Sequence, residues 1–164
     1  MIRAAFPADA GAFAEVITAA QSTWTEWAGA ALTPYDVAEL TATWCARLED
    51  PATIAAVSGT GGRITAVAAA GPEDASFQPS RCESASAHLS TLFALPETHG
   101  DGSTQALHDA ILIELNARGY RKVRLWVPAG AQRARRFYER NGWEATGNST
   151  VFAGLERLEM RRSC

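Results

Sequence analysis

The stretch LSTLFALPETHGDGSTQALHDAIL, Leu89 to Leu112, decides how this chain folds. Its apolar beginning belongs to a predicted strand over about Ala85–Leu95, and a glycine-containing loop over Pro96–Gly102 follows. This loop opens directly into a predicted helix that starts near Ser103. Strand, loop and helix in this order aim free backbone N–H groups and the positive end of a helix dipole at one point, which suits a phosphate.

Downstream of this stretch, strand and helix patterns alternate. The expected elements are a helix over Ser103–Arg118 capped by Gly119, a strand over Arg121–Val127, a helix from the turn Pro128-Ala129-Gly130 to Asn141-Gly142, and two strands within Trp143–Arg162 around Gly147 and Gly154. A strand, a helix and a second strand in this order predict a β-α-β crossover.

Upstream, the patterns predict a short strand, two helices and a hairpin. The first expected elements are a strand over Ile2–Ala5 and one long helix whose apolar side runs from Phe13 to Trp27. A second helix is expected to start at Thr33 and Pro34 and to end at Asp50-Pro51, with Val37, Leu40, Trp44 and Leu48 on one side. Strands over Thr53–Val57 and Arg63–Ala70 and a polar loop over 73–84 follow. Together the two halves predict an α+β fold with a mixed central sheet, antiparallel in its N-terminal part.

Composition and charge limit the function. The chain has 164 residues, 47% of them hydrophobic, and a net charge of −3, which fits one domain over residues 1–164 and argues against a general nucleic-acid binder. No stretch predicts a membrane span or a signal peptide, so the expected location is cytoplasmic. The cysteines Cys45, Cys82 and Cys164 form no disulfide or ligand pattern, so reduced thiols and no metal site are expected.

Two segments resemble the GCN5-related N-acetyltransferase (GNAT) family. The family's phosphate loop, Gln/Arg-x-x-Gly-x-Gly/Ala, falls on His99-Gly100-Asp101-Gly102-Ser103-Thr104. Its next signature, Asn-x-x-Ala-x-x-x-Tyr-x-x-x-Gly-Phe, falls on Ala131, Ala134, Tyr138, Gly142 and Trp143. A dinucleotide-binding domain is the main alternative, but the loop has no third glycine at Gln105 and the hairpins before it do not build a parallel sheet.

The resemblance implies the GNAT fold, in which two neighbouring parallel strands splay apart around the pantetheine arm of an acyl-CoA. Here these strands are 89–95 and 121–127, with a β-α-β unit forming the acyl-donor site. The implied backbone partners of pantetheine are Phe93, Ala94 and Leu95. The implied pyrophosphate site consists of His99, Gly100, Asp101, Gly102, Ser103, Thr104 and Gln105.

The resemblance also assigns the chemistry, as an N-acyltransferase that moves an acyl group, expected to be acetyl, to the amine of a small molecule. Tyr138 matches the family tyrosine that protonates the departing thiolate, although an aromatic side chain packed in the core is the alternative interpretation. His88 takes the position of the family's glutamate base, and Ser90, on the same strand face by alternation, is expected to hold a water. The acceptor region carries Trp24, Glu26, Trp27 and Tyr35, with Glu26 positioned to pair with an ammonium, although core packing also explains both tryptophans.

Four positions depart from the family pattern, and all concern the acyl donor. His99 and Ala131 replace a Gln/Arg and an Asn, Thr104 replaces a Gly/Ala, and Asp101 adds a negative charge. The departures predict weak binding of the nucleotide half of CoA. They leave three alternatives: an acetyl-CoA or other acyl-CoA donor, a phosphopantetheine arm on an acyl carrier protein, and a non-catalytic relative that binds a ligand or partner. The resemblance is also compatible with a homodimer.

Overall fold

The computed structural model describes residues 1–28, 35–73 and 86–164, without the side chain of Glu26. It forms a seven-stranded mixed sheet in the order β1-β2-β3-β4-β5-β7-β6. The strands are β1 Ile2–Ala4, β2 Ile54–Thr60, β3 Arg63–Pro72, β4 Ser86–Ala94, β5 Lys122–Pro128, β6 Glu144–Phe152 and β7 Leu155–Ser163. The helices are α1 Ala10–Ser22, α2 Thr25–Ala28, α3 Val37–Glu49, α4 Ser103–Ala117 and α5 Gln132–Arg140, with 3-10 turns η1 Pro7–Asp9 and η4 Pro96–Thr98.

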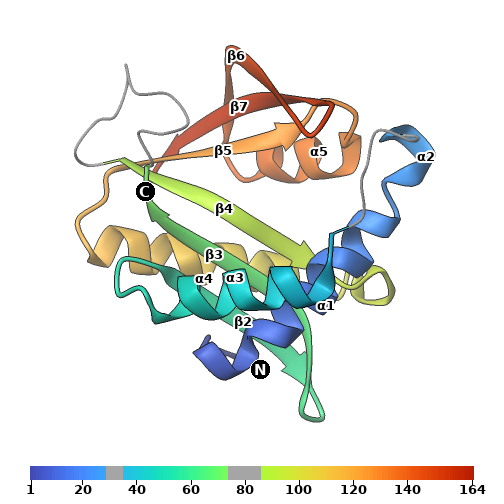
Figure 1. Cartoon of the computed structure of the whole chain (residues 1–164). Coiled ribbons are helices and arrows are strands. Elements are labelled where there is room, and N and C mark those ends of the chain that lie inside the picture. Colours follow the sequence, from blue (N-terminus) through green and yellow to red (C-terminus); the bar gives the residue numbers. More distant parts are fainter. Residues whose placement is uncertain (29–34, 74–85) are drawn as a thin grey trace.

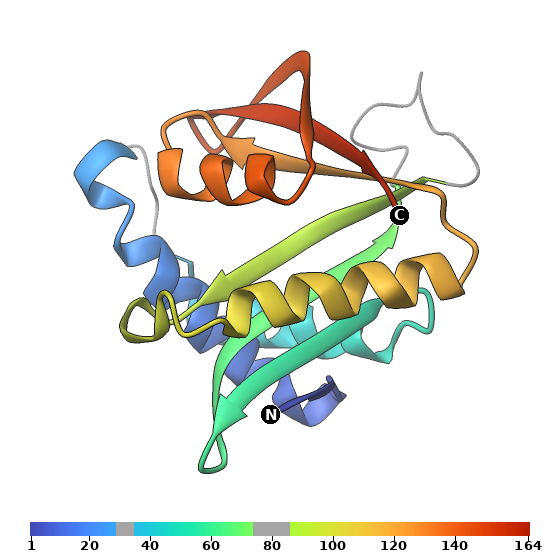
Figure 2. The same ribbon diagram turned by 180° about the vertical axis from the view of Figure 1, so that it is seen from behind.

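Helices cover the sheet from both sides. Helices α1 and α3 lie on one side, here called the α3 face, and α4 and α5 lie on the other, the α4 face (Figures 1 and 2). Side chains of β3 alternate between two cores: Ala66, Ala68 and Ala70 pack on the α4 face, and Val67 and Ala69 pack on the α3 face. A central strand that is buried on both faces explains the continuous apolar run in its sequence.

Strands β4 and β5 pair over three residues only and then separate. Their parallel pairing joins Ser86 to Lys122, Ala87 to Val123 and His88 to Arg124. Beyond these pairs, β4 stays bonded to β3 and β5 stays bonded to β7, while the two strands diverge (Figure 1). The structure therefore confirms both the mixed sheet and the splayed parallel pair.

A β-bulge bends β4 just after the last pair with β5. Ala70 lies opposite Leu89 and Ala69 lies opposite Thr91, so Ser90 is an extra residue without a partner in the ladder. Bulges bend a strand and increase its local twist. The bulge thus lies where β4 leaves β5, and it also ends the simple alternation of faces along β4.

The prediction of one helix through Trp27 is wrong. Helix α1 ends at Ser22, and the short helix α2 begins at Thr25. The hydroxyls of Ser22 and Thr23 donate to the carbonyls of Ala19 and Ala20, at 2.7 Å each. Such side-chain hydrogen bonds to the backbone compete with the continuing helix, and apolar periodicity does not detect them.

The start of the next helix also differs from the prediction. Helix α3 begins at Val37, and its N-cap is Asp36, whose side chain accepts the N–H of Glu39 at 2.9 Å. The expected start at Thr33 and Pro34 lies outside the described residues. On the predicted apolar side of α3, Trp44 is buried and Leu40 and Leu48 are partly buried. Val37, in the first turn of the helix, is exposed.

Several smaller expectations concern turns and thiols. The β2–β3 hairpin, the helix over α4 and the β6–β7 pair form where predicted. Cys45 and Cys164 are free, whereas Cys82 and most of the predicted polar loop lie outside the described residues. Within the described ranges, no helix is long and apolar enough to cross a membrane.

The cap at Asp36 generates a stability prediction. Replacing it by alanine leaves the N–H of Glu39 without its side-chain acceptor, so Asp36→Ala should lower the free energy of unfolding by about 1 kcal/mol. Asp36→Asn keeps an acceptor and should cost much less. Urea unfolding followed by circular dichroism measures both; equal stability of the alanine variant and the native chain would contradict the assignment of this cap.

Candidate functional site

The gap between β4 and β5 exposes backbone groups of β4. The N–H of Leu95 is bonded to the carbonyl of Thr65 on β3, at 2.8 Å. Bonded and non-bonded pairs alternate along an antiparallel ladder, so Phe93 also turns its backbone toward β3, whereas Ala94 and Leu92 turn theirs toward the gap. Of the three predicted backbone partners of pantetheine, Ala94 turns its backbone toward the gap, as Leu92 does, whereas the backbone groups of Phe93 and Leu95 face β3, contrary to the expectation.

The loop before α4 has the shape of an anion site. Gly100 and Gly102 adopt positive φ angles of 94° and 86°, a conformation that suits glycine, and a Cβ at either would meet no atom within 4 Å. The first helical N–H groups, including those of Thr104 and Gln105, have no carbonyl one turn earlier to bind. The loop therefore presents unpaired donors to an open space.

Asp101 already fills part of this loop. Its carboxylate accepts the N–H of Ser103 at 2.8 Å. Hydrogen bonds from the side chain and the backbone of Ser103 lower the pKa of Asp101, so it is ionised near neutral pH. The N–H of Ser103 is therefore already occupied by a negative group.

His99 connects the loop to β4 and α5. The Nη1 of Arg133 lies 2.9 Å from the Nδ1 of His99, and the ring also bonds the backbone carbonyl of Ala94. Burial, followed by the charge of Arg133, lowers the pKa of His99. His99 is therefore neutral, and Arg133 brings to the loop the positive charge that His99 lacks.

Tyr138 lies on α5 inside the core of the α4 face. Its ring forms edge-to-face contacts with Phe137 and Trp143, with centroids 5.4 and 5.7 Å apart. Burial raises the pKa of Tyr138, so the phenol is protonated. Its hydroxyl makes no hydrogen bond to the described residues, which leaves it available as a donor.

A polar network fixes α5 against α4. The Nε1 of Trp143 donates to the Nε2 of His108 at 3.0 Å, so the proton of His108 lies on Nδ1, which donates to Asp109 at 2.9 Å. Gln105 donates to Asp109 and exchanges hydrogen bonds with Asn141 at the end of α5. The side chain of Gln105 is thus used in packing two helices, and only its backbone N–H points into the loop.

His88 lies at the last pair before β4 and β5 separate, opposite Arg124. Leu89 packs on the α4 face, so alternation places the half-buried His88 on the α3 face. Arg124 is fully buried on the same face, and its Nη1 lies 2.8 Å from the carboxylate of Glu73. Glu73 also pairs with Arg161, at 3.1 Å. The candidate base is therefore beside a buried ionic cluster.

Ser90 does not have a free hydroxyl. Its Oγ accepts from the Nη2 of Arg47 at 2.7 Å and donates to the carbonyl of Ala69 at 3.2 Å. The expected water site at Ser90 is thus taken by Arg47 of α3. Arg47 carries no sequence motif, and only its contact with the bulge identifies it.

The predicted acceptor aromatics form one group at the end of α1. The ring of Trp24 lies 5.4 Å from that of Trp27 and 6.0 Å from that of Phe93. Trp27 is 37% exposed, and its ring packs so closely on Gly130 that a Cβ there would lie 2.5 Å from it. Trp27 therefore bridges α2 to the β5–α5 turn and is not part of the core. Tyr35 is exposed, and the side chain of Glu26 lies outside the described structure.

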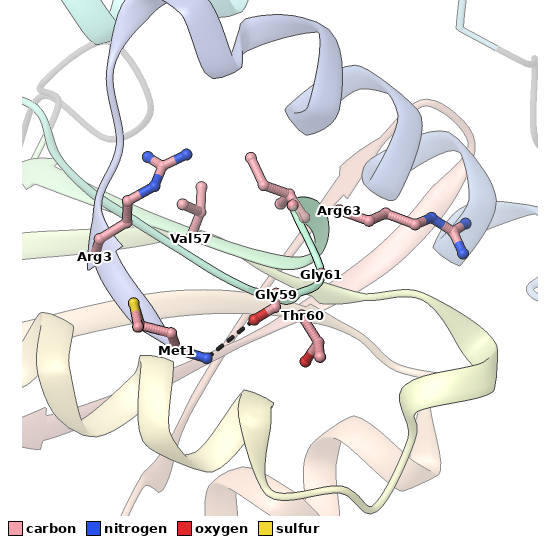
Figure 3. Close-up of a pocket in the computed structure, with 9 residues that line it drawn as sticks. Met1, Arg3, Val57, Gly59, Thr60, Gly61 and Arg63 are labelled. Atoms are coloured by element: carbon pink, nitrogen blue, oxygen red, sulfur yellow. Dashed lines mark hydrogen bonds between the residues drawn. The ribbon is translucent and has the colours of Figure 1, made fainter.

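A separate cavity of about 410 Å³ lies beside the β2–β3 hairpin (Figure 3). It is lined by residues of β1, β2 and β3, with Met1, Arg3, Gly59 and Arg63 among them. Arg3 pairs with Asp9 and Arg63 with Glu97. The cavity contains no residue of β4 or β5 and offers no group suited to acyl transfer.

Comparisons with known proteins agree with this geometry. The family model described as "Acetyltransferase (GNAT) domain" matches residues 42–164. No curated protein matches the sequence significantly.

Solved structures resemble the whole chain at low identity. A ribosomal-protein-alanine N-acetyltransferase from Brucella melitensis has a TM-score of 0.75 at 20% identity, covering 100% of this chain and 99% of its own. The acetyltransferase yncA from Salmonella typhimurium, solved with acetyl-CoA, has a TM-score of 0.73 at 20% identity, covering 99% and 92%. The PaiA N-acetyltransferase from Thermoplasma acidophilum, solved with coenzyme A, has a TM-score of 0.70 at 13% identity, covering 100% and 98%.

The buried His108 generates a pH prediction. Burial lowers its pKa below the ordinary value of about 6.5, so the unfolded chain binds a proton there that the folded chain does not. Above about pH 6.5, His108 is neutral in both the folded and the unfolded chain, and its burial is not penalised. As the pH falls below this value, the unfolded chain is stabilised by binding a proton, so the free energy of unfolding should decrease from pH 7 toward pH 5. His108→Gln keeps an acceptor for Trp143 and removes the titration. Urea unfolding at several pH values should show a shallower slope for the variant; an unchanged slope would contradict a neutral His108.

Proposed function

The chain belongs to the GNAT acetyltransferase family, and we propose that it transfers an acetyl group from acetyl-CoA to the amine of a small molecule. The observation that carries this proposal is the separation of β4 and β5 after His88 and Arg124. It leaves the backbone groups of Leu92 and Ala94 without a neighbouring strand, and an amide-bearing arm such as pantetheine can bind to them as a strand would.

The loop before α4 fits the pyrophosphate of the donor. The N–H groups of Thr104 and Gln105 and the positive end of the α4 dipole favour an anion there. Arg133 lies beside the loop through His99 and supplies a cation. The carbonyl of Ala94 already accepts from the ring of His99, and its second lone pair and the N–H of Ala94 are left for pantetheine.

One observation favours the carrier-protein donor as a second candidate. Asp101 occupies the N–H of Ser103 and adds a negative charge beside the proposed pyrophosphate site, which weakens binding of the nucleotide half of CoA. A phosphopantetheine arm on a carrier protein lacks that half. Calorimetry with acetyl-CoA, followed by mass spectrometry of acetylated amines, tests the proposal, which binding together with amine acetylation would support. Transfer from a carrier protein alone would establish the second candidate, and no transfer from either donor would reject both.

The proposed chemistry is direct transfer. The amine nitrogen attacks the thioester carbon, the C–S bond breaks, and the amine loses a proton as the sulfur gains one. We assign the removal of the amine proton to His88, because an imidazole is half-protonated near neutral pH. Tyr138 donates its hydroxyl hydrogen to the departing sulfur. Burial raises the pKa of this phenol, so it is in the protonated form that a proton donor needs, and it regains a proton after the products leave.

Tyr138→Phe should retain the fold, because it removes one hydroxyl that bonds no described residue. Loss of the donor should lower kcat by about 10²-fold without changing the affinity for acetyl-CoA. Single-turnover kinetics and calorimetry separate the two quantities. A variant with native single-turnover rates would eliminate Tyr138 as the proton donor.

His88→Gln tests the proposed base. With His88 present, kcat/KM should rise with pH through an ionisation at about pH 6–7, since the base acts only when neutral. In the variant this rise should disappear and leave only the titration of the substrate amine. A rise that persists at the same pH in His88→Gln would assign it to another group.

Arg133→Gln tests the source of the positive charge at the loop. The loss of one exposed cation beside a phosphate should weaken acetyl-CoA binding by about 1 kcal/mol, or roughly fivefold in Kd. Arg118→Gln removes an equal charge near the other end of α4, where Arg118 pairs with Glu114, and should leave Kd unchanged. Equal effects of the two substitutions would point to overall charge and not to a contact of Arg133.

A further inference from the structure

Arg47 is a half-buried charged side chain on the α3 face that has no role in the proposed chemistry. It lies near the end of α3, half-buried, with its Nη2 at the Ser90 bulge of β4. Ser90 follows His88 by two residues, so Arg47 reaches β4 just where the strand leaves β5. A guanidinium is thus held on the α3 face beside the point at which acyl transfer is proposed.

The position of Arg47 is fixed by its neighbours. Its guanidinium carbon lies 4.2 Å from the ring centroid of the buried Trp44, and that ring packs against Phe13 at 4.4 Å. The hydroxyl of Ser90 accepts from Arg47 and passes its own hydrogen to Ala69. An arginine held between an aromatic ring and a hydroxyl has already lost much of its side-chain freedom, which reduces the cost of binding a ligand.

Arg47 has no negative partner among the described residues. No carboxylate forms an ion pair with it in residues 1–28, 35–73 and 86–164, and its one polar contact there is the neutral Ser90. Burial accordingly lowers the pKa of Arg47 without an opposing charge. Half-buried arginines are expected to be paired, because an unpaired charge in a partly buried site is costly.

A buried donor without an acceptor lies on the same face of the sheet. Val123, Leu125 and Val127 of β5 pack in the core of the α4 face, so alternation places Trp126 on the α3 face. The Nε1 of Trp126 is buried and has no hydrogen-bond partner in the structure described. Trp126 belongs to the part of β5 that no longer pairs with β4. The face therefore carries both the charge of Arg47, which has no carboxylate partner among the described residues, and a buried donor without an acceptor, and both favour a ligand that brings acceptors.

We propose that the acceptor amine carries a carboxylate, as an α-amino acid does, and that Arg47 binds this carboxylate. The inference rests on the proposed acetyl transfer and names the substrate class of the same site. Arginine suits the role because its fork of N–H groups matches the two oxygens of a carboxylate. Trp24 and Phe93 lie on the same face and offer apolar surface to the rest of the acceptor.

The experiment measures acetylation of matched amines by the native chain. The panel consists of the twenty standard amino acids, each paired with its α-amide, which keeps the amine and removes the negative charge. With acetyl-CoA as donor, at least one amino acid should be acetylated with kcat/KM about 10-fold or more above its amide. In Arg47→Gln this preference should fall to near one, through a rise in KM for the acid with little change in kcat.

Controls separate this role from a structural one. Arg47→Lys keeps a charge without the fork and should retain part of the preference, while Arg118→Gln should retain all of it. Calorimetry should give the same Kd for acetyl-CoA in Arg47→Gln as in the native chain, and an unchanged melting temperature would show that the fold is intact.

Each remaining outcome has a definite meaning. Equal turnover of acids and amides by the native chain overturns the proposal, as does acetylation of amides alone. Acetyl-CoA binding without acetylation of any amino acid also overturns it and leaves the proposed donor in place. Equal loss of acid and amide turnover in Arg47→Gln assigns the arginine to the fold. Absence of acetyl-CoA binding by the native chain rejects the proposed function itself.

Discussion

The structure depends on the parallel pairing of β4 and β5, which ends after three residue pairs. β4 and β5 pair only at residues 86–88 and 122–124, and beyond these pairs each strand keeps only its other neighbour, β3 or β7. The edge of each strand that faces the gap is left without a partner strand. An unpaired backbone group costs about 1–3 kcal/mol when it is removed from water, so the gap favours any ligand that supplies the missing hydrogen bonds.

The elements around the gap fix its two ends. The Ser90 bulge bends β4 away and brings the strand to Arg47. On the opposite face, Trp143, His108 and Gln105 tie α5 to α4, which holds Tyr138 in a set of aromatic contacts. Tyr138 and Arg47 thus lie on opposite faces of the sheet.

The sequence predicts the fold well where local and global signals agree. Glycines at 100 and 102, the helix after them and the apolar strands give the order of the sheet and the crossover, and the family resemblance gives the splay. Periodicity fails at Ser22 and Thr23, whose hydroxyls break a helix that the apolar pattern continues through to Trp27. It also cannot detect the bulge at Ser90, because an extra residue in a ladder is a property of two strands.

The candidate site is less predictable, since it is built from contacts between distant residues. Motif positions predict roles for His99 and Tyr138, but the positive charge beside the loop belongs to Arg133, which lies 34 residues from His99 in the sequence. Alternation placed His88 and Ser90 on one face, yet only the structure gives Ser90 its partner Arg47. Phe93 lies in β4 as predicted and Leu95 directly follows it, but the direction of their N–H groups depends on the register with β3, which the sequence does not show.

Amide hydrogen exchange with and without acetyl-CoA tests the central claim most directly. If the donor binds in the gap as a substitute strand, a peptide spanning residues 89–95 should exchange more slowly with acetyl-CoA present, because the N–H groups of Leu92 and Ala94 gain partners. A peptide from β1, at the edge of the sheet and separated from β4 by β2 and β3, should not change. Binding of acetyl-CoA without protection of residues 89–95 would contradict the claim that the splayed strands form the donor site.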